Sequence, residues 1–291
     1  MKKFGMVFLA FSAMLSLLWH WLHSAAIVRV NTAQWSKYPF QVHFIDVGHG
    51  DSILLICEGQ AMLIDAGMPF WSKTVRKYLR LCGIESLDYL VCTHEHWDHA
   101  GGLRGIVEEF PVGRIYAPVR RAECVAKGYF NGFAEAAEAK GLQLERPELG
   151  SVWQLGGAEV KVVGPVDYTP APSHVENNHS IVLRVTYGDN SVLLLGDSEK
   201  YAHEAMLKSG LELKSDVVKV GHHGIRQDKE FYEAVAAKYA IVPGANMSKS
   251  RSADIEKYLR GAGTELWLIR EAGSVVCAGD GYEWTVSKSG E

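Results

Sequence analysis

The densest cluster of chemically reactive side chains in this sequence lies in a loop between two ordered elements. Tyr89-Leu90-Val91-Cys92 is apolar and typical of a β-strand, and the segment from Leu103 to Phe110 is typical of a helix. A strand would send successive side chains to opposite faces, whereas a loop can direct several toward one point. The sequence therefore predicts a strand, a loop of convergent polar side chains over Thr93 to Gly102, and a helix.

The loop contains three histidines and one aspartate, and they are His94, His96, Asp98 and His99. Neutral imidazoles and carboxylates are the usual ligands of Zn²⁺ and similar divalent ions. We expect His94 and His96 to contact one ion, and the other two residues to contact a second ion beside it. Four ligands are too few for two closed sites, so other segments must supply more. The alternative, a polar loop with chance histidines, is disfavoured by the density of ligand-type residues.

Composition sets wide bounds on this chain of 291 residues. Hydrophobic residues make up 47 % and charged residues 22 %, which suits one large α/β domain or two small ones. The formal net charge of −4 gives no overall attraction for nucleic acid, although a local basic groove remains compatible with it. The five cysteines are odd in number and form no CxxC pair, so they indicate no disulfide framework. We expect Cys57 and Cys92 to be buried as small hydrophobes.

The N-terminus has the pattern of an export segment. Lys2 and Lys3 precede an apolar stretch from Phe4 to Leu22, and Ser24-Ala25-Ala26 supplies small residues for a signal peptidase. A membrane anchor is the alternative, since a span needs about 20 apolar residues. Both interpretations place the remainder outside the cytoplasm, secreted or anchored to the outer face of the membrane. The expected division is a signal peptide or anchor over 1–26, a linker over 27–40 and one domain over 41–291.

The rest of the chain alternates short apolar strands with helices. A helix over Ser72 to Leu81 shows apolar residues at helical spacing, and a strand is expected over Leu266 to Arg270. An irregular lead-in is expected from Arg29 to Pro39. Because strand meanders alternate with helices in both halves, the sequence predicts two sheets packed face to face with helices outside, an α/β protein of the four-layer αββα sandwich class.

Further ligand-type residues stand at the ends of apolar runs. His179 precedes one such run, Asp197 follows another, and His222 and His223 follow a third. We expect one ion to be held by His94, His96 and His179, and the other by Asp98, His99 and one of His222 and His223. Asp197 would bridge the two ions, since a carboxylate can span about 3.5–4 Å.

Asp65 ends a strand near the same place. Its carboxylate is predicted to accept a hydrogen bond from a ligand histidine, which would fix the orientation of the ring. A simple turn cap is the alternative. Lys219 lies within a strand, where a solvated surface position is favoured over contact with a substrate phosphate.

These segments together resemble the metallo-β-lactamase-like domain of ComEC competence proteins, from about Gln41 to the C-terminus. The segments that carry the resemblance are Phe44-Ile45-Asp46-Val47-Gly48-His49-Gly50-Asp51-Ser52, Leu63-Ile64-Asp65-Ala66-Gly67, the loop with its H-x-H-x-D-H pattern, Asn177-Asn178-His179-Ser180-Ile181-Val182-Leu183, Leu194-Leu195-Gly196-Asp197 and Lys219-Val220-Gly221-His222-His223-Gly224. Two positions depart from the family. His49 stands where that branch usually has Gln, and His179 falls on a variable position, so that Asn178 or His179 is expected to face the metal.

The resemblance implies a hydrolase with two divalent ions, Zn²⁺ or Mn²⁺, and no organic cofactor. The resemblance favours hydrolysis of phosphodiester bonds over other reactions. Single-stranded DNA is a candidate substrate, in a role connected with DNA uptake. DNA transport by this chain alone is not implied. Asp98 and His222 are assigned catalytic roles and His223 the role of ligand, with the choice between the two histidines open. The histidine that is not a ligand would protonate the leaving oxygen.

Two alternatives remain open at this point. One is hydrolysis of a small phosphodiester or a cell-wall phosphocholine ester, with cation–π contacts from Trp71, Trp97 or Trp153, although a core position is expected for each of these residues. The other is a binding module that keeps the fold without turnover.

Overall fold

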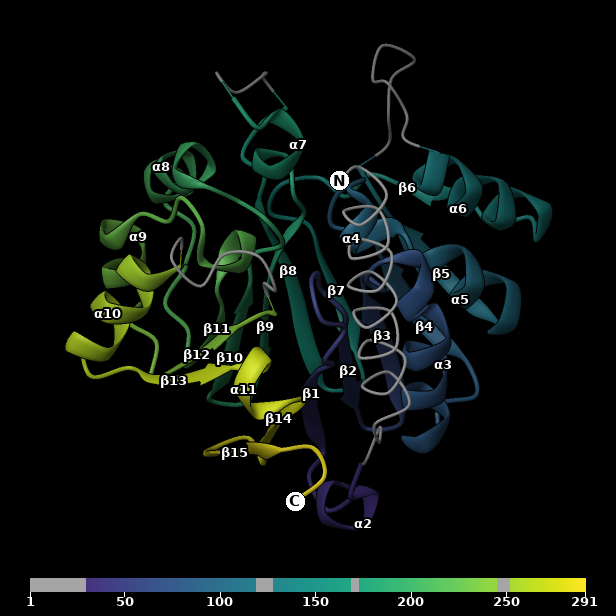
Figure 1. Cartoon of the computed structure of the whole chain (residues 1–291), viewed down its shortest axis with the longest axis horizontal. Helices are drawn as coiled ribbons and strands as arrows, with labels where there is room; N and C mark the ends of the chain where they lie inside the picture. The colour runs from purple at the N-terminus through teal and green to yellow at the C-terminus, as the bar shows by residue number, and fades with distance from the viewer. Residues whose placement is uncertain (1–29, 119–127, 169–172, 245–251) are drawn as a thin grey trace, which may run out of the picture.

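The computed structural model describes residues 30–118, 128–168, 173–244 and 252–291. The predicted export segment at 1–26 and Cys124 lie outside these ranges. Within them, no helix is both long and apolar enough to cross a membrane. Figure 1 shows two β-sheets side by side, with helices on the outer face of each.

The first sheet is mixed and has eight strands within the described ranges. In spatial order these are β15 (Trp284–Lys288), β14 (Val275–Gly279), β1 (Phe40–Phe44), β2 (Ile53–Cys57), β3 (Gln60–Ile64), β4 (Leu87–Val91), β5 (Val112–Tyr116) and β6 (Leu144–Glu145). Strands β3 to β6 run parallel, and the pairs around β1, β2, β14 and β15 are antiparallel.

The second sheet is also mixed and has seven strands in the part of the chain that the structure describes. Their order is β13 (Glu265–Leu268), β12 (Tyr239–Val242), β11 (Val217–Lys219), β10 (Asn190–Leu194), β9 (Val182–Tyr187), β8 (Ala158–Gly164) and β7 (Val152–Leu155). Strands β10 to β13 are parallel. Strands β7 to β10 form an antiparallel meander.

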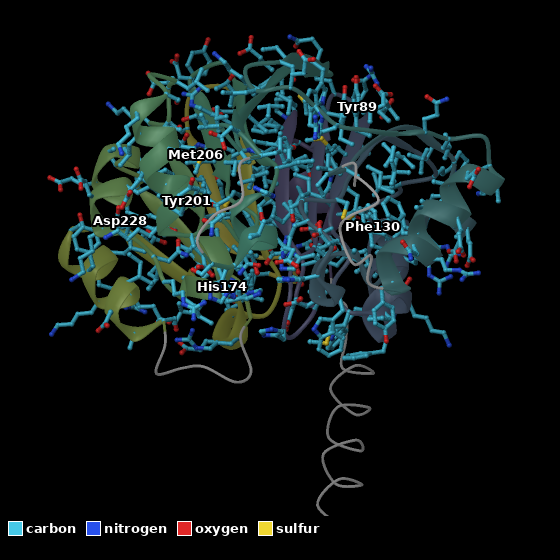
Figure 2. The ribbon with its side chains drawn as sticks, turned by 90° about the horizontal axis from the view of Figure 1, so that it is seen from above. Tyr89, Phe130, His174, Tyr201, Met206 and Asp228 are labelled. Carbon is cyan, nitrogen blue, oxygen red and sulfur yellow. The ribbon has the colours of Figure 1, made fainter. Side chains whose placement is uncertain are left out.

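Helices form the two outer layers. The first sheet is covered by α3 (Ser72–Leu81), α5 (Leu103–Glu109) and α6 (Gly128–Ala139), and the second by α8 (Lys200–Lys208), α9 (Lys229–Val235) and α10 (Ala253–Gly261). Met206 of α8 and Phe130 of α6 accordingly lie on opposite sides of the sheets (Figure 2). Shorter helical turns are α2 (Thr32–Trp35), η1 (Pro69–Trp71), α4 (Trp97–Ala100), α7 (Val175–Asn178), η2 (Gly221–Gly224) and α11 (Ile269–Ala272).

Three apolar cores separate the four layers. The central core joins the sheets face to face and includes Leu55 and Met62 from the first sheet and Leu183 and Ile241 from the second. The other two cores lie between each sheet and its helices. Each buried side chain of this kind contributes roughly 1.5–3 kcal/mol. The predicted αββα sandwich is confirmed.

Two local expectations from the sequence are wrong. The lead-in from Arg29 to Pro39 is not wholly irregular, because α2 forms there and its Trp35 is buried against β14. The expected strand over Leu266 to Arg270 ends early, since the chain turns into α11 at Ile269. That turn places Ile269 in the central core and lets Arg270 bond both carboxylate oxygens of Glu256 at 2.9 Å.

Candidate metal centre

The loop after β4 carries the first group of polar side chains. His94 and His99 are fully buried, Asp98 is 6 % exposed and His96 is partly buried. His96 has an extended backbone and immediately precedes α4, so the chain changes direction between the two halves of the motif. The ring centroid of His94 lies 4.7 Å from that of His96 and 4.2 Å from that of His99. The loop therefore brings the three histidines together, as the sequence predicted for a convergent loop.

Asp65, directly after β3, holds this loop in place. Its carboxylate accepts hydrogen bonds from the backbone amide of Thr93 at 2.8 Å and from the Thr93 hydroxyl at 2.6 Å. Its Oδ2 also lies 2.8 Å from Nδ1 of His99, which leaves Nε2 of that ring directed into the cluster. A carboxylate behind a histidine in this way fixes the ring and raises its strength as a ligand.

Asp197 reaches the cluster from the second sheet through a tight turn after β10. Gly196 has a φ of +51°, and a Cβ there would lie 2.9 Å from Ser180 and 3.0 Å from Thr93. The Ser180 hydroxyl accepts a hydrogen bond from the Asp197 amide at 3.1 Å and lies 3.4 Å from Nδ1 of His94. Ser180 thus joins the loops of the two sheets beneath the site.

The two adjacent histidines after β11 have different surroundings. Both lie in the left-handed region, with φ of 39° at His222 and 52° at His223. Such conformations cost of order 1–3 kcal/mol each and cluster at functional sites. The buried His223 enters the cluster, with Nε2 at 3.5 Å from Asp98 and 3.7 Å from Asp197. His222 turns toward Glu199 instead, with its Nδ1 at 2.6 Å from the carboxylate.

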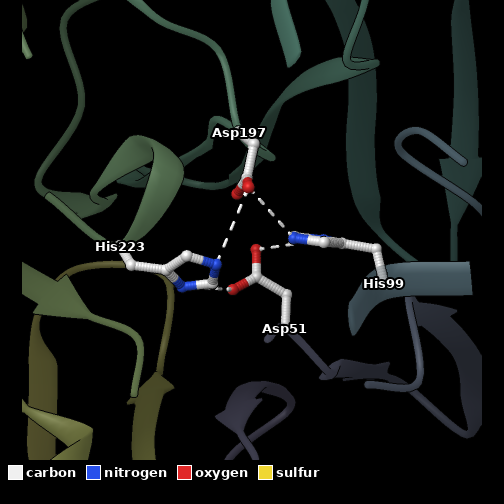
Figure 3. Close-up of side chains that lie close together, drawn as sticks. All are labelled: Asp51, His99, Asp197 and His223. Atoms are coloured by element: carbon white, nitrogen blue, oxygen red, sulfur yellow. Dashed lines mark ion pairs between the residues drawn. The ribbon is translucent and has the colours of Figure 1, made fainter. Parts of the chain in front are cut away.

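The cluster brings together atoms from loops of both sheets (Figure 3). Oδ2 of Asp197 lies 3.2 Å from Nε2 of His99, 3.7 Å from Nε2 of His223 and 3.9 Å from Nε2 of His94. Ligand atoms bound at 2.0–2.1 Å to one tetrahedral ion lie about 3.3 Å apart, and the separation between Asp197 and His99 matches that spacing best. Asp51, His99, Asp197 and His223 form one group that could hold a metal ion, and His49, Asp98 and His223 form a second.

The residues fit a bound cation because several of their buried atoms that face the cluster make no hydrogen bond among the described residues. Within the described ranges, several buried atoms here have no hydrogen-bond partner: Nε2 of His94, His99 and His223, Nδ1 of His223, and one oxygen each of Asp51 and Asp197. An unpaired buried polar atom costs about 1–3 kcal/mol, so such a group of them indicates a ligand.

The protonation states agree with this interpretation. Burial lowers the pKa of His94 well below its ordinary value and keeps the ring neutral, as a ligand must be. Burial also opposes protonation of His99, but the nearby carboxylates of Asp197, Asp51 and Asp98 raise its pKa. Burial works against the charge on Asp98 and Asp197 as well, yet His99 holds the pKa of each below its usual range. A bound cation would replace the positive charge of the protonated His99 ring beside these carboxylates.

Lys219 corrects an expectation, because it is fully buried rather than solvated at the surface. Its ammonium forms an ion pair with Asp51 and donates a hydrogen bond to the carbonyl of Gly196 at 2.6 Å. It also lies 3.8 Å from Oδ1 of Asp197. The sequence predicts Asp51 only as part of a turn. Its place two residues before the buried strand β2, at the same sheet edge as Asp65, was the signal that it lies at the cluster.

A second polar group lies beside the cluster around Glu199, which sequence reasoning also missed. Its carboxylate accepts a hydrogen bond from Nδ2 of Asn177 at 3.0 Å and also pairs with His222. The Arg226 guanidinium lies 3.7 Å away. Burial opposes the charge on Glu199, but the bond from His222 lowers its pKa. Burial likewise opposes protonation of His222, but Glu199 raises the pKa of that ring.

The two candidates for the third ligand of the first ion lie in and after α7. The amide of Asn178 is used within the protein, since its oxygen accepts from the backbone of Glu199 and Ala202 and its nitrogen donates to Ser173 and His174. It therefore caps the N-terminus of α8. The His179 ring lies against Tyr168, with centroids 5.3 Å apart. Its role as a ligand stays a prediction.

The three tryptophans differ in exposure. Trp153 is buried in the central core, as expected. Trp71 is partly buried and packs against Gly48. Trp97 does not have the expected core position, because 47 % of it is exposed beside Asp98. The buried positions expected for Cys57 and Cys92 are confirmed.

Comparison with known proteins identifies the family. The model of the metallo-β-lactamase superfamily matches residues 45–239. The chain belongs to this superfamily. The loop after β4, Asp197 and His223 all lie within the matched range. Among solved structures, the metallo-β-lactamase fold protein YhfI from Bacillus subtilis is similar in fold, with a TM-score of 0.52, 13 % identity, and coverage of 79 % of this chain and 96 % of that one.

Competence proteins are among the relatives of this superfamily member. ComE operon protein 3 of Bacillus subtilis is 30 % identical over 69 % of this chain and 28 % of its own length. Competence protein ComA of Neisseria gonorrhoeae is 28 % identical over 76 % of this chain and 30 % of its own length. The ComEC-type resemblance is confirmed. The match spans less than a third of each relative.

Proposed function

We propose that this superfamily member is a metal-dependent hydrolase of phosphodiester bonds, with single-stranded DNA as the leading substrate. The observation that carries the proposal is the set of buried imidazole and carboxylate atoms without hydrogen-bond partners in the described ranges, which meet around Asp197. Similarity to competence proteins supports a phosphodiester over a lactam.

Two divalent ions, Zn²⁺ or Mn²⁺, suit this donor set, since imidazole and carboxylate accept both. His94, His96 and His179 would hold one ion, Asp98, His99 and His223 the other, and Asp197 would contact both. Divalent ions at such a site activate water as a nucleophile at neutral pH and offset the charge of a phosphoryl group.

The chain's own residues would then position the reacting groups. Asp98, with imidazole nitrogens around one of its oxygens, would orient the attacking water. Glu199 holds Nδ1 of His222, so that Nε2 is the nitrogen able to donate a proton to the leaving oxygen. Arg226 is about half exposed beside Glu199 and would contact the phosphate.

The test begins with metal analysis of the full chain purified without added metal. Hydrolysis of bis-(p-nitrophenyl) phosphate and of end-labelled single-stranded DNA is then measured with and without Zn²⁺ or Mn²⁺. We expect bound or restorable metal and turnover of both substrates. His96→Ala and Asp98→Asn should reduce turnover to background in a folded protein. A chain that neither contains metal nor recovers activity with it would be a binding module instead.

A second candidate function rests on the exposure of Trp97. An aromatic face beside the centre suits a choline headgroup through a cation–π contact worth about 0.5–2 kcal/mol. The substrate would then be a phosphocholine ester. p-Nitrophenyl phosphorylcholine should be hydrolysed faster than bis-(p-nitrophenyl) phosphate in that case, and Trp97→Ala should raise KM for the choline ester alone.

Export completes the proposal, with the chain secreted or anchored at the outer face of the cytoplasmic membrane. It is supported by the lysines, apolar stretch and small residues of 1–26. Fractionation of cells and N-terminal sequencing of the mature chain would test it. Intact chain that begins at Met1 in the cytoplasmic fraction would contradict it.

A further inference from the structure

A histidine outside the superfamily loop motif lies at the metal centre. His49 belongs to the turn between β1 and β2, which packs directly on the loop after β4. Gly50 has a φ of +119°, and a Cβ there would lie 2.1 Å from the Asp98 carbonyl. The amide of Asp51 donates to that same carbonyl at 3.2 Å. This close approach of two backbones places the His49 side chain over Asp98.

The His49 ring is aimed at the cluster rather than at solvent. Its side chain is 29 % exposed, and Nε2 lies 3.1 Å from Oδ2 of Asp98. Its centroid lies 4.6 Å from that of His223. Its Nδ1 is buried and has no hydrogen-bond partner among the described residues. A partly desolvated ring of this kind gains most from a strong interaction inside the site.

Three imidazoles surround one carboxylate oxygen. Oδ2 of Asp98 lies 3.1 Å from Nε2 of His49, 3.5 Å from Nε2 of His223 and 3.9 Å from Nε2 of His99. Hydrogen bonds from N–H to oxygen are typically about 2.7–3.2 Å long, whereas ligands of one ion with bonds of 2.0–2.1 Å are separated by about 3.3 Å. The separation of 3.5 Å from His223 is too long for such a hydrogen bond and close to the ligand spacing, and the separation of 3.1 Å from His49 fits both.

We propose that His49 is a direct ligand of the metal position formed by Asp98 and His223. This inference rests on the metal centre of the proposed function and adds a ligand to it. The position gains an imidazole donor from a fourth segment of the chain. The two metal positions are then unequal, and the one beside His49 binds its ion more tightly than the one formed by His94 and His96.

The proposal predicts a stepwise metal titration that depends on His49. The full chain, freed of metal with a chelator, is titrated with Co²⁺ while visible absorption is recorded, and affinities are measured by competition with a chelating dye. The wild-type chain should bind two equivalents in distinct steps. His49→Gln should weaken the tighter step by at least about 10–100-fold, the loss typical of groups that merely support a ligand. The visible bands of the first equivalent should change as well.

Matched variants distinguish direct coordination of the ion by His49 from a hydrogen bond by which His49 only supports Asp98. His174→Gln alters an exposed histidine that contacts Arg226 and should leave both binding steps unchanged. His49→Cys should produce a sulfur-to-cobalt charge-transfer band that the wild-type chain lacks, because a thiolate at that position would coordinate directly. Circular dichroism and thermal melting of the metal-free variants show that the fold is retained.

The outcomes are decisive in either direction. If His49→Gln binds both equivalents with wild-type affinity and spectrum, or His49→Cys gives no new band, His49 is only a hydrogen-bond partner of Asp98 and the inference fails. A wild-type chain that binds no metal overturns this inference together with the metal centre. A chain that binds metal in the expected steps and hydrolyses no ester contradicts the proposed function and still supports the role of His49.

Discussion

Lys219 of β11 and Asp51 of the β1–β2 turn form an ion pair that joins the two sheets inside the protein. Lys219 is fully buried and Asp51 is 3 % exposed. The ammonium also bonds the carbonyl of Gly196, one residue before Asp197. The pair therefore helps to fix the position of Asp197, on the second sheet, relative to the turn of the first sheet that contains Asp51.

Breaking this pair on one side should destabilise the protein strongly. Lys219→Met or Asp51→Asn leaves a buried group without its partner, which typically costs about 3–5 kcal/mol. The double variant should recover most of that loss, because removal of both charges is often close to neutral. Urea unfolding of the three variants measures the effect. Single variants within about 1 kcal/mol of the wild type would show that the pair is not structurally important.

Loss of the carboxylate behind His99 should weaken metal binding without unfolding the protein. In Asp65→Asn the ring of His99 loses its charged partner at 2.8 Å, and metal affinity should fall by about 10–100-fold. Isothermal titration with Zn²⁺ or Mn²⁺ provides the measurement. Asp88→Asn is the matched control, since Asp88 bonds the Ala61 amide on the same sheet away from the centre. Equal affinities in the two variants would contradict the role of Asp65.

The proposed proton donor should matter only for poor leaving groups. His222→Gln should lower kcat on DNA by roughly 10²–10⁴-fold, the usual contribution of general acid catalysis. Hydrolysis of bis-(p-nitrophenyl) phosphate should change little, since p-nitrophenolate leaves without a proton. Glu199→Gln should show the same pattern more weakly, because Glu199 holds the ring at 2.6 Å. Equal losses on both substrates would assign His222 a structural role instead.

The buried His203 should make stability fall in acid. Burial lowers its pKa to about 3, so the folded protein keeps it neutral where the unfolded chain, with a pKa of about 6.5, takes up a proton. The contribution is fully present above pH 6.5 and declines as the pH falls toward 3. The free energy of unfolding should drop by about 2 kcal/mol from this group between pH 6.5 and 5.

His203→Leu should remove this part of the pH dependence. Urea unfolding at both pH values, in the presence of a chelator, measures the difference between variant and wild type. His174→Gln, which replaces a histidine at an exposed position and leaves His203 in place, is the matched control. An identical slope in His203→Leu would mean that the ring titrates normally in the folded state.

The pattern of neighbouring residues was sufficient to predict the αββα sandwich and the loop of convergent side chains after β4. The helix expected over Ser72 to Leu81 has those bounds, because its apolar spacing lies within a few turns of chain. Asp65, Asp197 and the histidines after β11 were found because each follows a buried strand at one edge of a sheet. The helical turn at Ile269 was missed, since a contact with Glu256 on α10 decides it.

What the sequence by itself determined is the set of donor types and the strand ends that carry them, since periodicity and turns are properties of neighbouring residues. Tertiary structure alone decided which of two consecutive histidines enters the cluster, because backbone conformations at His222 and His223 turn one ring to Glu199 and the other to Asp98. It also decided that Lys219 is buried and that His49 lies over Asp98. Those relations depend on how two sheets and a turn meet, and no short stretch of chain contains both partners.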